Sequence, residues 1–209
     1  MKIGLIEPHY LPSLEYFCAL LPLDKIILEQ HEHYVKQSDR NRCHLNTARG
    51  TGMLVVPLTQ KHGKVRFKDI RIDYSLKWQN NHWRTIQAAY AKAPFFEHYR
   101  DELNAILFQP ERFLADLDRH LLSFCLRNLG VKKLVSETVA YEKEVNPEIF
   151  DLRSRISSKI PCSERSYYRP QPYHQVFGNG FASNLSIIDL LFCEGPGALT
   201  ILRDSGKVN

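Results

Sequence analysis

Short apolar runs near the start of the chain are separated by a segment in which apolar residues recur every three or four positions. The runs Lys2 to Ile6 and Lys25 to Glu29 are typical of buried strands of a parallel sheet. Between them lie apolar residues at helical spacing: Leu14, Phe17, Cys18 and Leu21. They predict a helix from about Ser13 to Leu21, with Ser13 as its N-cap. The short connections indicate a βαβ unit with two neighbouring parallel strands.

A polar region and a second pair of strands are predicted next. From His31 to Thr51 polar residues dominate and no periodicity is visible, which indicates a loop. Met53 to Leu58 and Val65 to Ile72 are typical of strands, and Lys61 to Lys64 between them contains a glycine. We expect these two segments to form a β-hairpin.

Helical periodicity dominates the middle of the chain. It predicts three helices whose ends are marked by prolines: Gln79 to Ala91, Phe95 to Leu107 and Glu111 to Leu129. Val131 to Ser136 returns as a strand, Pro147 to Ser157 is interpreted as a short helix, and Leu185 to Leu191 as another. This order predicts an α/β fold, namely a single domain over residues 1–209 with a mixed, mostly parallel sheet flanked by helices and a β-hairpin insertion.

Composition favours a packed globular protein. Hydrophobic residues make up 44% of the chain and charged residues 24%. No apolar run approaches the roughly 20 residues that a membrane-spanning helix needs, and the N-terminal run is too short for a secretory signal. The five cysteines form no C-x-x-C pair, and Cys18 and Cys125 lie in apolar helical patterns, as expected for buried free thiols. We therefore expect a cytoplasmic protein without a membrane span.

The net charge of +5 is unevenly distributed. Basic residues gather in two stretches: Lys36, Arg40, Arg42 and Arg49, and then Lys61, Lys64, Arg66, Lys68 and Arg71. They indicate either a surface that faces a small anionic ligand or the solvated side of a loop and a hairpin. Nucleic acid is an unlikely partner, because no helix-turn-helix, zinc-finger or ribonucleoprotein signature is present.

The loop that begins at His31 is the first candidate site, because ligands of open α/β sheets bind at the carboxyl ends of strands. Lys36, Arg40 and Arg42, together with Asn41, are suited to a phosphate or carboxylate, although Arg40 and Arg42 are equally suited to pairing with Asp39 and Glu32. The full set of ligand-binding candidates is Tyr34, Lys36, Arg40, Asn41, Arg42, Trp83 and Tyr90.

His31 and His82 are the candidates for proton transfer, and we expect His82 to share a cleft with the loop. His82 is also suited to a hydrogen bond with a backbone carbonyl. His31 and His33 have a spacing usable for a metal, but no third ligand is evident, so no metal site is predicted. Asp189 is expected to form a structural ion pair or helix cap, and Cys43 is interpreted as either a buried inert thiol or an activated nucleophile.

Four separated motifs occur in order along the chain. They are Tyr10-x-Pro12-x-x-x-Tyr16-Phe17; Glu29-Gln30-His31-Glu32-x-Tyr34-x-Lys36-Gln37 with Arg40-Asn41-Arg42-Cys43; Trp78-x-x-x-His82-Trp83-Arg84-x-Ile86-x-x-Ala89-Tyr90 with Pro94-Phe95-Phe96; and Pro172-Tyr173-His174-Gln175-Val176-Phe177 with Asn184-Leu185-Ser186-Ile187-Ile188-Asp189-Leu190-Leu191-Phe192-x-Glu194-Gly195-Pro196. Together they resemble the WbqC-like protein family, particularly its short Bacteroidetes-type branch. Two features differ from longer members, which carry an additional glycine-rich segment and in many cases have Gln where this chain has Glu7.

The resemblance implies a transferase that moves an aminoacyl group such as glycine, or another acyl group, to an activated sugar in bacterial surface-polysaccharide (O-antigen) biosynthesis. The implied partner is a small anionic ligand such as a nucleotide-sugar or an acyl donor, and no cofactor is specified. A second enzymatic interpretation compares the strand, the turn with His9 and the following helix with adenylylating α/β transferases, but their H-x-G-H motif is absent. The alternative is a non-catalytic binding module for a nucleotide, a nucleotide-sugar or a partner enzyme.

Overall fold

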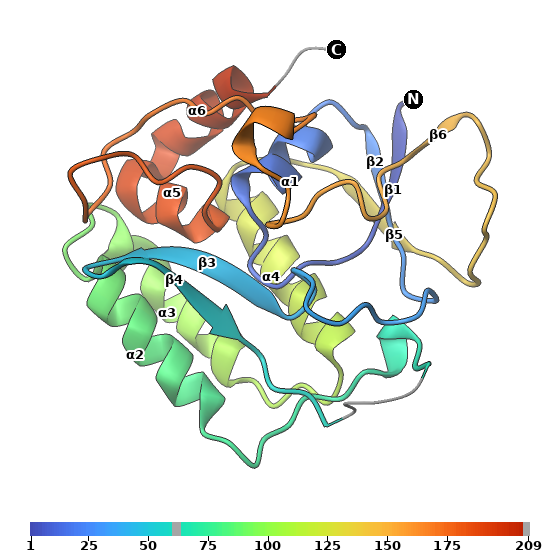
Figure 1. The fold of residues 1–209 in the computed structure, drawn as a ribbon, viewed down its shortest axis with the longest axis horizontal. Helices are drawn as coiled ribbons and strands as arrows, with labels where there is room; N and C mark the ends of the chain where they lie inside the picture. Colours follow the sequence, from blue (N-terminus) through green and yellow to red (C-terminus); the bar gives the residue numbers. More distant parts are fainter. Residues whose placement is uncertain (60–63, 207–209) are drawn as a thin grey trace.

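The computed structural model describes residues 1–59 and 64–206, and four parallel strands form its main sheet in the order β5-β2-β1-β6 (Figure 1). The strands are β1 (Ile3–Ile6), β2 (Lys25–Leu28), β5 (Leu134–Glu137) and β6 (Ile149–Asp151). Because all neighbours pair in parallel, the four carboxyl ends lie at one edge of the sheet. With its flanking helices and a separate antiparallel hairpin, the chain has the α/β fold that the sequence predicted.

The first unit confirms the predicted βαβ arrangement. Helix α1 (Leu14–Leu20) connects β1 to β2, and the two strands pair directly, with Ile3 opposite Lys25. Every residue of α1 is buried, and α6 (Ala198–Ser205) packs against it. The apolar spacing at Leu14, Phe17 and Cys18 therefore marks a helix inside the protein core.

The start of α1 is capped by a distant residue. Ser13 stands at the predicted N-cap, but its side chain makes no capping hydrogen bond. Instead, the backbone N–H of Glu15 donates to Oδ1 of Asn184 at 2.8 Å. Asn184 has a left-handed backbone with φ of 54°, which aims its amide at the helix start. The cap therefore comes from the C-terminal part of the chain, which local sequence does not reveal.

The hairpin lies earlier in the chain than predicted. Its strands are β3 (Arg42–Thr47) and β4 (Gly50–Val55), joined by a tight turn in which Gly50 has a φ of 94°. The predicted hairpin of Met53 to Leu58 with Val65 to Ile72 is therefore wrong, and among the described residues these two segments pair at a single antiparallel bridge between Leu58 and Ile72. The second segment contains a short 3₁₀ turn, η1 (Phe67–Asp69), because Phe67 and Ile70 are buried singly instead of alternating along a strand. The predicted connecting turn falls largely on residues 60–63, outside the described residues.

The three predicted central helices are present and pack one on the next. They are α2 (Trp78–Tyr90), α3 (Phe96–Phe108) and α4 (Leu114–Asn128). The predicted C-terminal helix is α5 (Ile187–Glu194), followed by the 3₁₀ turn η3 (Gly195–Gly197) and α6; another 3₁₀ turn, η2, covers Cys162–Glu164. The predicted short helix at Pro147 to Ser157 is wrong, because Ile149–Asp151 pairs with β1 as an edge strand.

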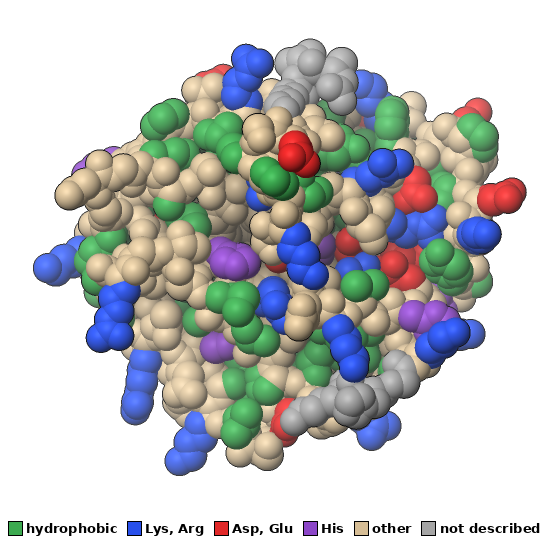
Figure 2. All heavy atoms as spheres, in the orientation of Figure 1, with side chains coloured by type: hydrophobic (Ala, Val, Ile, Leu, Met, Phe, Trp, Pro, Cys, Tyr) green, Lys and Arg blue, Asp and Glu red, His purple; other side chains and the backbone are tan. Residues whose placement is uncertain are grey.

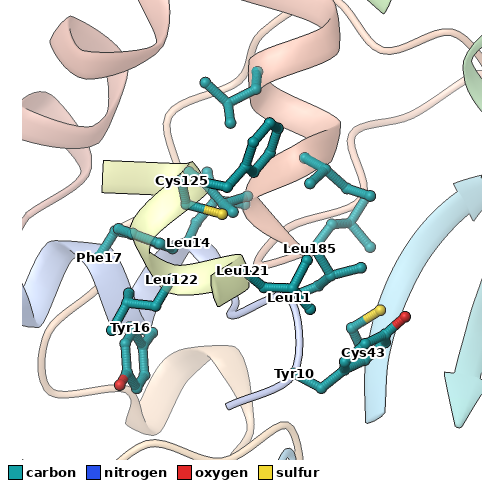
Figure 3. Packing of buried hydrophobic residues seen from close by; sticks show 14 of the residues in the cluster. Tyr10, Leu11, Leu14, Tyr16, Phe17, Cys43, Leu121, Leu122, Cys125 and Leu185 are labelled. Carbon is teal, nitrogen blue, oxygen red and sulfur yellow. The ribbon is translucent and has the colours of Figure 1, made fainter. Parts of the chain in front are cut away.

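The core lies where α1, α4, α5 and β3 meet. Figure 3 shows Leu11, Leu121 and Leu185 close together there, with Tyr10 beside Cys43 of β3. Cys18 and Cys125 are buried free thiols, as predicted, and the structure forms no disulfide within the described residues. None of the helices described here has the length and apolarity required to span a membrane.

Candidate functional site

Charged side chains gather where the parallel strands end. Glu7 directly follows β1, Glu29 directly follows β2, and Arg153 lies two residues after β6. Figure 2 shows acidic and basic side chains intermixed on the part of the surface where Figure 1 places the loops after these strands. We call this group the carboxyl-edge cluster: Glu7, His9, Glu29, Glu32, Arg40, Asp151 and Arg153.

Glu7 is the buried centre of the cluster. The backbone N–H of Ser154 donates to both carboxylate oxygens, at 3.1 and 3.0 Å. His9 Nε2 lies 3.6 Å and Arg40 Nη2 3.5 Å from Glu7 Oε1. Burial raises the pKa of Glu7, but its contacts with His9 and Arg40 outweigh this effect and hold the pKa at about 2. Glu7 is therefore a carboxylate at neutral pH.

His9 has one ring nitrogen beside this carboxylate and one nitrogen without a partner. The side chain is only 3% exposed, and Nδ1 has no hydrogen-bond partner among residues 1–59 and 64–206. A buried polar atom without a partner is costly and calls for an explanation, such as a bound ligand or water. A carboxylate that orients one nitrogen while the other is available is also the arrangement of a general base.

Arg40 is held between two acids. Its Nε donates to Glu32 Oε1 at 3.1 Å, its Nη2 also contacts that oxygen, and Glu7 lies on its other side. Burial raises the pKa of Glu32, an effect that Arg40 partly offsets. The pairing of Arg40 with Glu32, one of the two sequence-based interpretations, is therefore present.

Glu29 organises the loop after β2. Its Oε1 accepts hydrogen bonds from the backbone N–H groups of His31 at 2.7 Å and Glu32 at 3.1 Å, and from the Thr138 hydroxyl at 3.1 Å. Its other oxygen lies 3.3 Å from Arg153 Nη1. Arg153 in turn contacts Asp151 at 2.8 Å and lowers the pKa of that carboxyl. One carboxylate thus ties together the chain segments that follow β2, β5 and β6.

The carboxyl-edge cluster has a surplus of negative charge. Within the cluster itself, four carboxylates, those of Glu7, Glu29, Glu32 and Asp151, outnumber the guanidinium groups of Arg40 and Arg153, and Arg155 also acts on Asp151 from outside the cluster. Such a site is complementary to an ammonium group or to sugar hydroxyls, which donate hydrogen bonds. Within the described part of the chain, no three His, Cys, Asp or Glu side chains are arranged to hold a metal ion.

Two of the sequence-predicted residues lie at this cluster, and the others lie beyond it. Arg40 belongs to the cluster, and His31 borders it through its backbone bond to Glu29. Lys36 is exposed on the surface. The Tyr34 hydroxyl donates to Asn41 Oδ1 at 2.9 Å, and Asn41 Nδ2 donates to the carbonyl of Val56 at 2.8 Å. Tyr34 and Asn41 therefore fasten the loop to the hairpin.

Arg42 and Cys43 point to opposite faces of β3. Cys43 is buried in the core, and burial raises the pKa of its thiol, which is the inert state that the sequence left as one option. Because side chains alternate along a strand, Arg42 points to the outer face, where it lines a small pocket with Ser13 and Asn184.

His82 lies on the inner side of the same hairpin. Its Nδ1 is 2.9 Å from the Tyr10 hydroxyl and its Nε2 is 3.2 Å from the carbonyl of Val55, the residue opposite Arg42. Burial lowers the pKa of His82 to about 4, so the ring is neutral at pH 7. His82 is therefore held by Tyr10 and Val55, and it is not among the lining residues of the small pocket to which Arg42 contributes.

The remaining predicted residues of α2 belong to the core. Trp83 stacks on Phe96, with ring centroids 6.2 Å apart. The Tyr90 hydroxyl donates to Asp189 Oδ1 at 2.9 Å. The other Asp189 oxygen accepts from the Tyr173 hydroxyl at 2.5 Å and from Gln175 Nε2 at 3.0 Å, and burial raises the pKa of Asp189. The predicted ion pair is absent here, because three neutral donors satisfy this carboxyl.

Sequence reasoning missed Glu7, His9, Glu29 and Arg153 as site residues. A signal existed for Glu7 and Glu29, since each is the first charged residue after an apolar strand. Arg153 gave no such signal, because the strand before it was interpreted as a helix.

Comparisons with known proteins place the cluster within a family match. The model of the WbqC-like protein family matches residues 7–160, a range that contains every member of the carboxyl-edge cluster. The chain is also similar to the uncharacterized protein Rv1507c of Mycobacterium tuberculosis. The two are 26% identical over an alignment of 234 residues, which covers 97% of each chain. No solved structure matches the chain.

Proposed function

We propose that this chain, which belongs to the WbqC-like protein family, is a transferase that moves a glycyl or other acyl group to an activated sugar in the assembly of bacterial surface polysaccharide. We propose further that residues 1–209 act as one domain, with the reaction at the carboxyl-edge cluster. The observation that carries the proposal is the pair formed by Glu7 and His9, with an unpartnered ring nitrogen at the strand ends.

The chemistry required of this pair is proton transfer. In acyl transfer, an amine or hydroxyl of the sugar attacks the acyl carbon, loses a proton, and displaces a leaving group that gains one. His9 Nδ1 accepts the proton from the attacking group and returns it to the leaving group, while Glu7 stabilises the imidazolium form through Nε2. The one proton that moves, the bond formed at the acyl carbon and the bond broken to the leaving group are thereby accounted for without a further reactant.

The charge of the cluster supports an amino-containing or hydroxyl-rich substrate. The surplus carboxylates attract an ammonium such as that of a glycyl group, and they accept hydrogen bonds from sugar hydroxyls. A phosphate group on either substrate would be repelled here. We therefore propose that it lies outward, toward the exposed Lys36 and the outer face of Arg42.

Binding and turnover together test this function. Nucleotide-sugars, glycine and aminoacyl donors are titrated by calorimetry, and binding pairs are then incubated and examined for an acylated sugar by mass spectrometry. We expect His9→Gln to lower turnover at least a hundredfold and leave ligand affinity within threefold, because the amide keeps polarity but does not transfer protons. The matched control is His120→Gln on α4, which should change neither quantity. Unchanged turnover in His9→Gln would refute the assignment.

A non-catalytic binding module is the second candidate, favoured by the ion pairs that already occupy Arg40 and Arg153. In that case the cluster is a recognition surface whose charges are fixed in advance. A ligand would then bind and no product would form under any pairing of donor and acceptor. Glu7→Gln would weaken ligand binding. His9→Gln would change the ligand affinity, and there would be no turnover for it to change.

A further inference from the structure

A large cavity lies at the other edge of the parallel sheet. Its volume is about 780 Å³, within the roughly 300–1,000 Å³ typical of small-molecule sites. Cys18 and Ala19 of α1 and Leu199 and Leu202 of α6 contribute to its walls, together with the chain segments just before β1 and β5. This amino-edge cavity shares no residue with the carboxyl-edge cluster.

Among residues 1–59 and 64–206, the charged residues that line the cavity are all cationic: Lys2, Lys132, Lys133 and Arg203. Lys2, Lys132 and Arg203 are exposed, whereas Lys133 is half-buried and donates to the carbonyl of Leu21 at 2.7 Å and to that of Leu23. The nearby acid is Asp24, which accepts a hydrogen bond from the backbone N–H of Lys2 at 2.7 Å and is not part of the lining. The cavity therefore has apolar walls and a positive rim.

We infer that the amino-edge cavity binds an amphipathic anion, with a long acyl or alkyl tail against the apolar walls and a carboxylate or phosphate head group at the basic rim. Burial of the tail removes apolar surface of both ligand and cavity from water. The head group receives charge-assisted hydrogen bonds from Lys and Arg side chains. This inference does not depend on the proposed transferase function, since it rests on different residues.

Charge complementarity selects this ligand over other occupants. A neutral apolar compound would leave the three exposed cations of the lining, Lys2, Lys132 and Arg203, without a counter-charge from the ligand, and a cationic amphiphile would be repelled by them. A compact anion without a tail would leave the apolar walls unfilled. A second copy of this chain would bring the same positive rim against the first.

The test compares ligands that share one tail. Dodecanoate, dodecyl phosphate and dodecyltrimethylammonium are titrated by calorimetry below their micelle concentrations, at low and high salt. We expect at least one anion to bind the full chain at least tenfold tighter than the cation, with the advantage shrinking at high salt. The stronger of the two anions identifies the head group. Equal affinity for anion and cation, or no binding of any of the three, would overturn the inference.

Variants locate the binding. Lys132→Gln combined with Arg203→Gln should reduce the affinity for the anion at least tenfold and leave the affinity for the cation unchanged or higher. Leu199→Trp should weaken all tails, because Leu199 is half-buried in the wall and a larger side chain fills the space. Lys92→Gln is the control, because Lys92 is exposed, follows the end of α2 and is not part of the cavity lining. Anion binding that survives both sets of substitutions would refute the site.

Cysteine labelling provides a readout that needs no substitution. Cys18 lies in the cavity wall, whereas Cys162 is exposed elsewhere. A bound tail should slow the reaction of Cys18 with a small methanethiosulfonate at least fivefold, as followed by peptide mass spectrometry, and leave Cys162 unaffected. An equal decrease in the labelling rates of both cysteines would contradict a ligand in the cavity. So would light scattering that shows dimers under the conditions in which Cys18 is protected.

Discussion

At the carboxyl ends of β1, β2 and β6, Glu7, Glu29 and Arg153 are buried in ion pairs, whereas at the amino ends Lys2, Lys132 and Arg203 stand exposed around an apolar cavity. The parallel sheet thus has the carboxyl-edge cluster of ion pairs at one edge and the amino-edge cavity at the other. At the carboxyl edge ion pairs hold the loops in place, whereas at the amino edge the walls are apolar and Lys133 bonds to backbone carbonyls and forms no ion pair with a described residue. Substitutions at the two edges should therefore have different consequences.

The largest effect is expected for Arg40→Ala. Arg40 is 2% exposed and lies between the buried Glu7 and the partly buried Glu32, so its removal leaves both carboxylates without this cation. Breaking such a pair costs about 3–5 kcal/mol of unfolding free energy. Arg119→Ala is the control, because Arg119 is about 41% exposed and its pairs with Asp116 and Glu137 contribute roughly 0–1 kcal/mol. Urea denaturation measures both, and equal losses would erase the distinction between buried and exposed pairs.

Glu7 should make the carboxyl edge sensitive to acid. Its pKa is held at about 2, below the ordinary value of 4.5, so its ionised form stabilises the fold above about pH 5. This stabilisation is lost as the pH falls from about 5 to 2, and it amounts to about 3 kcal/mol. The variant Glu7→Gln has no such titration, and Gln still accepts the hydrogen bond from Ser154.

The difference between the two proteins isolates Glu7 from the other carboxyl groups. Unfolding free energies measured from pH 7 to pH 2 should fall more steeply for the parent chain than for Glu7→Gln. Parallel curves would mean that the contacts of Glu7 with His9 and Arg40 do not stabilise its ionised form in the folded protein. The carboxyl-edge cluster would then lose its electrostatic centre.

Helix α1 connects the two edges, and its cap is predicted to contribute less. The helix begins near the carboxyl edge and ends with Cys18 and Ala19 in the cavity wall. Asn184→Ala removes the acceptor of the Glu15 N–H and should cost about 1 kcal/mol. Asn184→Gly also removes the cap but tolerates the left-handed backbone, so it should cost less than Ala. Thermal unfolding separates the two contributions: a larger loss for Gly would contradict the role of the left-handed backbone, and no loss for Ala would contradict the cap.

Sequence patterns predicted the interior of the fold better than its edges. The apolar run Lys2 to Ile6 and the helical spacing at Leu14, Phe17 and Cys18 are local signals, and the structure confirms the elements they predict. Strand β6 has three residues and is defined by pairing with β1, a partner far away in the sequence, so Pro147 to Ser157 was interpreted as a helix. The cap at Asn184 has the same long-range origin.

The candidate site was harder to predict for a related reason. Polar crowding between His31 and Thr51 pointed to the loop but concealed the alternation of Arg42, Cys43 and His44 that marks β3. Arg42 and Cys43 are neighbours in the sequence, but their side chains lie on opposite faces of β3. The amino-acid composition of this segment does not show which residue lies on which face. The buried pairing of Arg40 follows from Glu7, which lies 33 positions earlier in the chain.

The smallest effect on stability is expected at the amino edge. Lys132→Gln combined with Arg203→Gln should change the unfolding free energy by less than about 0.5 kcal/mol, because both side chains are exposed and neither forms an ion pair with another described residue. Removing two of four neighbouring cations also relieves mutual repulsion, so any change should be toward greater stability, and it should shrink as salt is added. Urea denaturation at low and high salt measures both features. A loss above 1 kcal/mol would mean that these cations support the fold as Arg40 does, and their exposure would then need a structural explanation in place of a ligand.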